Sequence, residues 1–113
     1  MEQINQIELK GNIGMVKVNE VAGNKVARFS LATNYVYKNK EGEGVVETTW
    51  HNIVAWEDCV HCEFEKIQKG APVHVFGRLR SVKFNGIDGT EKQIYEVIAN
   101  SVDIETFRKQ ASV

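Results

Sequence analysis

Several features are scarce or missing in this chain of 113 residues. Its two cysteines, Cys59 and Cys62, lie too close together in the sequence to crosslink distant parts of a fold, which excludes a disulfide framework. No apolar run approaches the roughly 18 residues that span a bilayer, and the N-terminus lacks a charged-then-apolar signal pattern. The length and these absences predict one domain located in the cytoplasm.

Motifs that mark catalytic and cofactor sites are also missing. The sequence contains no P-loop, no nucleophile elbow and no His-Glu-x-x-His pattern. Cys59 and Cys62 have the spacing of a zinc half-site, but only His51 and His74 remain to supply a second pair of ligands. Buried cysteines on a helix are therefore favoured over a metal site. We expect a binding protein with no cofactor and no metal, rather than an enzyme.

Acidic residues are absent from residues 66–86, although this stretch contains five basic side chains: Lys66, Lys69, Arg78, Arg80 and Lys83. Residues 15–40 carry another five, Lys17, Lys25, Arg28, Lys38 and Lys40, against the single acid Glu20. The net charge is nevertheless −1, because acids collect in 41–47 and 57–65. Such segregation can build a basic groove on a near-neutral protein, with a random solvated surface as the alternative.

Hydrophobic residues alternate with a period of two over most of the chain, which predicts strands. We expect strands near 7–14, with a bend or bulge at Gly11 and Gly14, and over 26–37, 45–56, 73–84 and 94–104. Glycine-containing turns at 22–24, 39–44 and 85–90 predict extended hairpins. Residues 57–69 have helical spacing, with Asp58 as a cap and Gly70 and Pro72 as a stop. This order predicts an all-β, five-stranded barrel of the oligonucleotide-binding type with one short helix between the third and fourth strands.

Two tryptophans are expected to point away from the core. In the third strand Ile53 and Ala55 are natural core residues, so Trp50, Asn52, Val54 and Trp56 share the opposite face. In the fourth strand, an inward Leu79 likewise leaves Arg78, Arg80, Val82 and Phe84 outside. Rings interleaved with cations suit single-stranded nucleic acid, because stacking stabilises each base by about 1–3 kcal/mol whatever its identity. A ring that closes the barrel end or fills an oligomer interface is the alternative.

Five segments, in order and at matching spacings, resemble the bacterial single-stranded DNA-binding protein family over residues 4–104. They are 7–14 (IELKGNIG), 29–33 (FSLAT), 47–54 (ETTWHNIV), 69–70 (KG) and 75–80 (VFGRLR). The resemblance implies a Greek-key barrel that assembles, usually as a homotetramer, with DNA wrapped around it. It implies sequence-independent binding and protection of single-stranded DNA in replication, recombination and repair, in the cytoplasm at the nucleoid.

The resemblance also assigns site residues. The family's base-stacking positions fall on Tyr37, Trp50, Trp56 and Phe84, and its phosphate-contacting positions match Lys38, Lys69, Arg80 and Lys83. Lys40, Arg78, Arg28 and Asn52 complete the predicted nucleic-acid surface, although Asn52 stands where the family has a basic residue. His51 falls near the family's subunit contacts. His74 and Phe76, outward on a strand, are expected in the same oligomer interface.

Some features depart from the family pattern. Met15-Val-Lys17 replaces an acidic-proline step, and Val82 replaces a basic residue, which suggests fewer phosphate contacts. We expect a domain over 1–106 and a frayed end over 107–113, without the family's acidic C-terminal tail that recruits replication proteins. The chain is then either a tail-less relative or a truncated one. A dimeric primosome-type accessory protein, or a protein-interaction module using Trp56, His74 and Phe76, remain the alternatives.

Overall fold

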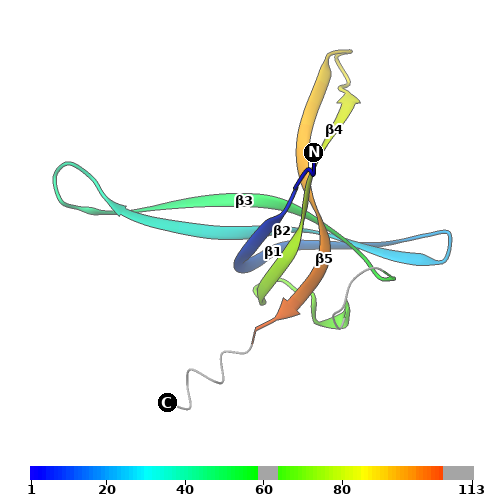
Figure 1. Ribbon diagram of the computed structural model, residues 1–113, viewed down its shortest axis with the longest axis horizontal. Coiled ribbons are helices and arrows are strands. Elements are labelled where there is room, and N and C mark those ends of the chain that lie inside the picture. Colours follow the sequence, from blue (N-terminus) through cyan, green and yellow to red (C-terminus); the bar gives the residue numbers. More distant parts are fainter. Residues whose placement is uncertain (59–63, 106–113) are drawn as a thin grey trace.

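The computed structural model describes residues 1–58 and 64–105, which form a closed barrel of five strands. The strands are β1 (Ile7–Val21), β2 (Asn24–Lys38), β3 (Gly44–Trp56), β4 (Pro72–Asn85) and β5 (Glu91–Ile104). Neighbours around the barrel follow the order β1-β2-β3-β5-β4, with β5 returning to lie parallel to β3 (Figure 1). The expected all-β barrel is confirmed, and the last four strands agree with their expected bounds to within three residues. The first strand is longer than expected, because β1 continues past the bulge after Ile13 and ends at Val21.

Three hairpins project from the barrel as long arms (Figure 1). They project because the barrel is closed by short ladders: β3 pairs with β5 only at Ile53 and Val54, and β1 pairs with β4 only over residues 7–12. Beyond these ladders each hairpin consists of two strands that pair with each other and, within the described residues, with no third strand. We call residues 33–49 the β2–β3 arm and residues 78–96 the β4–β5 arm. Gly42 and Gly89 turn the two tips at φ values of 82° and 83°, which glycine adopts without strain.

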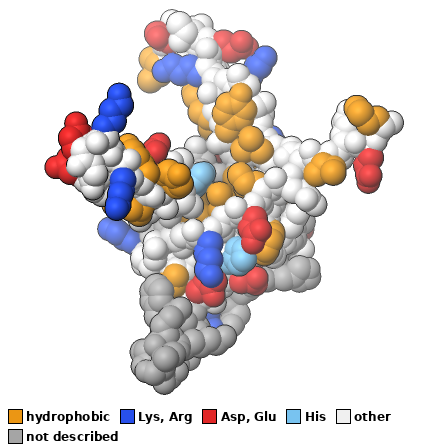
Figure 2. Space-filling model, turned by 60° about the vertical axis from the view of Figure 1, so that its left-hand side comes forward, with side chains coloured by type: hydrophobic (Ala, Val, Ile, Leu, Met, Phe, Trp, Pro, Cys, Tyr) orange, Lys and Arg blue, Asp and Glu red, His pale blue; other side chains and the backbone are white. Residues whose placement is uncertain are grey.

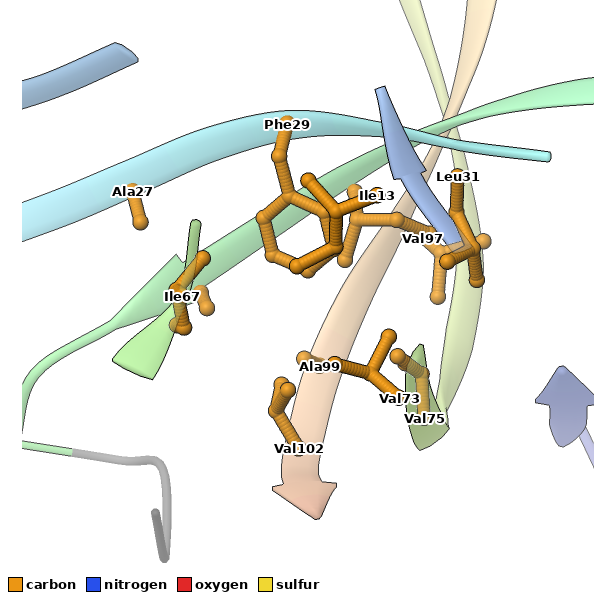
Figure 3. Packing of buried hydrophobic residues seen from close by; sticks show 12 residues of the cluster. Ile13, Ala27, Phe29, Leu31, Ile67, Val73, Val75, Val97, Ala99 and Val102 are labelled. Carbon is orange, nitrogen blue, oxygen red and sulfur yellow. The ribbon is translucent and has the colours of Figure 1, made fainter. Parts of the chain in front are cut away.

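Alternating apolar side chains from all five strands fill the barrel. Phe29 and Leu31 of β2 meet Ile53 of β3, Val97 of β5 and Val75 of β4, all nearly free of solvent (Figure 3). Alternation therefore places the intervening residues of β2, β3 and β5 on the outer surface. A second, smaller cluster lies on that outer surface, where Val26, Val54 and Ile98 are buried against Trp56.

Two expectations are wrong in detail. The helix expected over 57–69 is a single 3-10 turn, η1 (Phe64–Lys66), within the described part of that segment. Leu79, expected inward, is 42% exposed, because it lies on the β4–β5 arm where the strand has left the barrel. Among residues 1–58 and 64–105, no helix is long and apolar enough to cross a membrane.

Candidate nucleic-acid interface

The outer face of β3 carries both tryptophans, as expected, but their environments differ. Trp50, at the base of the β2–β3 arm, is 59% exposed. Trp56, at the end of β3, is half-buried against Val26, Val54 and Ile98. Both rings point away from the core, but Trp56 is partly covered, because neighbouring strands β2 and β5 supply apolar side chains that pack against it. Neither ring lies inside the barrel.

A buried carboxylate joins two of the predicted cations on this outer face. Glu96 of β5 accepts a hydrogen bond of 2.8 Å from Nη1 of Arg28 on β2 and another of 2.8 Å from Nη2 of Arg80 on β4. The Glu96 side chain is 7% exposed, whereas both arginine side chains are about half exposed, at 49% and 47%. The two guanidinium groups are thus held in place across the sheet while keeping donors free for a ligand.

The pKa of Glu96 follows from this environment. Burial raises the pKa of its carboxyl, but the hydrogen bonds and positive charges of Arg80 and Arg28 outweigh burial, so its pKa lies below the ordinary value. Glu96 stays ionised and neutralises part of the charge that the two arginines bring. Reasoning from the sequence missed Glu96. It lies two residues before Ile98 in β5, so both side chains are on the same, outer face of the strand.

A shallow hollow of about 390 Å³ lies beside this ion-paired group. Its lining combines apolar and polar side chains from four strands: Met15, Val16, Lys17, Arg28, Phe29, Ser30, Asn52, Ile53, Val54, Ile94 and Glu96. Asn52 is exposed there and donates through Nδ2 a long hydrogen bond of 3.4 Å to the carbonyl of Tyr95. An apolar hollow with amide, hydroxyl and guanidinium groups at its walls can hold a flat heteroaromatic group.

The remaining predicted cations lie along and between the arms. Lys38 and Lys40 are exposed near the tip of the β2–β3 arm, and Arg78 and Lys83 are exposed on β4. Lys69 lies in the turn before β4, apart from the strands that carry the rings. Figure 2 shows hydrophobic side chains near the bases of the arms and Lys and Arg side chains further out on two of them. The structure thus gathers Arg28, Arg80 and Asn52 near the hollow and leaves the predicted lysines on the periphery: Lys38, Lys40, Lys69 and Lys83.

Tyr37 and Phe84 are both exposed, at 42% and 44%, but they do not lie beside Trp50. Phe84 lies near the tip of the β4–β5 arm, opposite Lys92. Tyr37 is an odd number of residues away from Ala32, which lies opposite Trp50, so its side chain is on the face of the β2–β3 arm opposite to that of Trp50. The four predicted rings therefore do not form one continuous platform.

Two exposed tyrosines were missed by the sequence reasoning. Tyr35 stacks on Tyr37 with ring centroids 6.0 Å apart and an interplanar angle of 27°. Tyr95 lies exposed on the β4–β5 arm, opposite Ser81. A two-residue alternation from Tyr37 back to Tyr35 could have found the first. Tyr95 lies within the strand expected over 94–104, so the same alternation could have placed it on a strand face as well.

The three residues predicted at an oligomer interface lie in two places. His74 and Phe76 are on the outer side of β4, where the rings pack with centroids 4.5 Å apart and Nε2 of His74 lies 2.6 Å from Oε2 of Glu8. His51 is on the barrel-facing side of β3, where its Nε2 lies 2.9 Å from the hydroxyl of Thr33. Partial burial lowers the pKa of His51, which favours its neutral ring.

The zinc half-site Cys59–Cys62 lies outside the described residues. Within the ranges that are described, no group of three or more His, Cys, Asp or Glu side chains is arranged to hold a metal ion.

Comparison with known proteins agrees with this architecture. Residues 4–106 match the Single-strand binding protein family. A single-stranded DNA-binding protein of Xanthomonas campestris pv. campestris is 36% identical over 104 residues, covering 89% of this chain and 60% of the relative. One of Neisseria meningitidis serogroup B is 32% identical over 90 residues, covering 80% and 52%. The chain thus spans little more than half the length of these curated relatives.

Solved structures show the same fold. A chain of the Plasmodium falciparum SSB complex with ssDNA superposes with a TM-score of 0.79 at 28% identity, covering 94% of this chain and 98% of that one. A deletion mutant of the single-stranded DNA binding protein from Thermus aquaticus superposes with a TM-score of 0.73 at 21% identity, over 93% of this chain and 52% of that one. With a barrel of the oligonucleotide-binding type and a family match over nearly its whole length, the chain belongs to the single-strand binding protein family.

Proposed function

We propose that this protein binds single-stranded DNA without sequence preference and protects it during replication, recombination and repair. Bases stack on exposed rings, foremost Trp50, while Arg28, Arg80 and the peripheral lysines contact phosphates. The protein acts by binding and not by catalysis, and we place it in the cytoplasm at the nucleoid. Family membership and the ssDNA-bound structural relative support this proposal.

One observation carries the proposal beyond the family match. Trp50 is a large apolar ring, 59% exposed, on the outer face that also bears Arg28, Arg80 and a hollow lined by Asn52 and Ser30. A bare indole in water normally has a partner, because its apolar area is otherwise left hydrated. Cations on the same face supply the charge that a phosphate backbone requires.

Titration with oligo-dT tests the proposal. We expect tryptophan fluorescence to be quenched on binding, because a thymine stacks on Trp50. We expect the logarithm of the binding constant to fall with the logarithm of salt concentration, with a slope of about 0.7 per neutralised phosphate. Neither quenching nor salt dependence would be seen if the outer face serves a protein partner instead. Oligo-dA and oligo-dC of the same length test the lack of sequence preference.

We further propose that the protein is a homo-oligomer, most simply a tetramer, that uses the surface around His74 and Phe76. Phe76 is 40% exposed and forms an apolar contact with the His74 ring on a strand face, a feature suited to a symmetric contact between copies. For His51, which lies apart from this surface and contacts the Thr33 hydroxyl through Nε2, we propose a structural role.

A further inference from the structure

Gly14 of β1 lies beneath the ring of Trp50. The β1–β2 register shifts between Ile13 and Val16, which leaves Gly14 and Met15 in a bulge beside Ser30. Trp50 pairs with Ala32 of β2, so its indole must extend across β2 to reach β1. A Cβ placed on Gly14 would lie 2.6 Å from Cζ3 and 3.0 Å from Cη2 of Trp50. The outer edge of the six-membered ring therefore rests on the glycine backbone.

The path of the indole across the sheet is lined by small residues. Ala32 lies opposite Trp50, and Ser30 is next along the same face of β2. The hydroxyl of Ser30 accepts a hydrogen bond of 3.0 Å from the backbone N–H of Met15, and it would lie 2.7 Å from a Cβ on Gly14. The bulge, the serine and the ring thus meet at one point. A larger residue at position 14 would disturb that contact.

We propose that Gly14 is a positioning residue for base stacking: the missing side chain lets the indole of Trp50 lie against β1 and β2 and present its open face to a nucleobase. This inference rests on the proposed binding of single-stranded DNA. A ring already held against the sheet loses little freedom when a base stacks on it, so less binding energy is lost to ordering. Gly14 itself need not touch the DNA.

A side chain added at position 14 should displace the Trp50 ring without disrupting the fold. Gly14 is not among the residues with positive φ, so alanine fits its backbone conformation. The nearest atom to the added methyl group belongs to the Trp50 ring, which is largely exposed and can swing into solvent. We therefore expect Gly14→Ala to leave the barrel folded while lifting the indole from its place.

A double-mutant cycle tests the coupling, with affinity measured by the anisotropy of a labelled oligo-dT. We expect Gly14→Ala to weaken binding by about three- to tenfold, a part of the loss that removing a stacking ring causes. In the Trp50→Ala background the same substitution should have no effect, because the ring that it displaces is gone. An unchanged affinity for Gly14→Ala, or an equal loss in both backgrounds, would overturn the inference.

A second measurement needs no DNA and separates this inference from the proposed function. A Trp56→Phe background leaves Trp50 as the one tryptophan, whose emission can be excited apart from that of the three tyrosines. In this background Gly14→Ala should shift the Trp50 emission to longer wavelength and increase its quenching by acrylamide. An unchanged emission would mean that Gly14 does not position the ring, whether or not DNA binds. Failure of the unmodified protein to bind oligo-dT, with the emission shift present, would instead contradict the proposed function.

Gly44→Ala is the matched control for both measurements. Gly44 begins β3, lacks positive φ and has no atom within 4 Å of an added Cβ. The same change of glycine to alanine there alters backbone entropy without touching Trp50. It should leave both the affinity and the emission of Trp50 as they are.

Discussion

Residues on the outer face of β3 differ sharply in solvent exposure, although the two-residue alternation of the strand predicts the same exposure for all of them. Trp50 and Val54 lie on the same side of β3, yet Trp50 is largely exposed and Val54 is almost fully buried. The difference arises because β5 reaches β3 only at Ile53 and Val54, so it covers that end of the strand and leaves the other bare. On this face of β3, Trp50 is therefore accessible to a ligand and Val54 is not.

At this scale we expect Trp50→Ala to weaken oligo-dT binding by about 1–3 kcal/mol without unfolding the domain, since the ring is exposed and contributes stacking rather than core packing. Isothermal titration gives the affinity, and circular dichroism checks the fold. Val46→Ala is the control, because Val46 lies on the same face of β3 and is equally exposed, at 59%. Equal affinities for the two variants would remove Trp50 from the site.

At the scale of the strands, the ion-paired group of Arg28, Glu96 and Arg80 depends on three strands together. β2 contributes Arg28, β4 contributes Arg80, and β5 brings Glu96 between them. Only the barrel order, which places β5 between β3 and β4, makes this contact. The carboxylate fixes both guanidinium groups and also lowers the local positive charge.

We expect Glu96→Gln to change how binding depends on salt. Removing one negative charge frees the guanidinium donors that Glu96 now occupies, so that they can engage a further phosphate in addition to the contacts proposed above. The slope of log affinity against log salt should then steepen by about 0.7 per added phosphate contact. Affinity at low salt should rise for the same reason. Titrations over a range of salt concentrations measure both. Glu91→Gln, on the exposed start of β5, is the control; a slope matching that of the control would contradict the competition between Glu96 and phosphate.

The ion pairs of Glu96 with Arg28 and Arg80 also link the stability of the fold to pH. Because the folded pKa of Glu96 is lowered, its ion pairs stabilise the fold fully above the ordinary pKa that it has in the unfolded chain, and this stability is lost as pH falls through the lower folded pKa. Glu96→Gln should therefore cost about 1 kcal/mol at neutral pH, since the arginines are half in solvent, and less in acid. Urea unfolding at pH 7 and at pH 3 gives the two values.

At the scale of the whole molecule, three arms extend from a small barrel and two of them, the β2–β3 arm and the β4–β5 arm, carry exposed rings; the longest dimension is 47 Å. Trp50 lies at the base of the β2–β3 arm, Tyr37 lies on the other face of the same arm, and Phe84 lies near the tip of the β4–β5 arm. A single strand that contacts all three must therefore curve around the molecule or run between copies of it. Assembly and DNA binding are thus expected to be coupled in this protein.

Light scattering at micromolar concentration should give a mass above that of the monomer. Phe76→Ser should lower that mass, because it removes an exposed ring from the proposed contact. Leu79→Ser is the control, since Leu79 lies on the same strand at similar exposure, 42% against 40%, but points to the other side. A monomeric unmodified protein, or an equal effect of both changes, would contradict the proposed interface.

The amino-acid sequence by itself determined the five strands, their turns and the inward set of Phe29, Leu31, Ile53, Val73 and Val75, because a period of two in hydrophobicity and glycine at turns are local properties. It also placed Trp50 outside. Tertiary structure alone decided that Trp56 is covered, that Leu79 is exposed, that Glu96 joins Arg28 to Arg80, and that Gly14 lies beneath Trp50. Each of these depends on which strands are neighbours and where their pairing ends, and such contacts between distant segments leave no periodic signal in the chain.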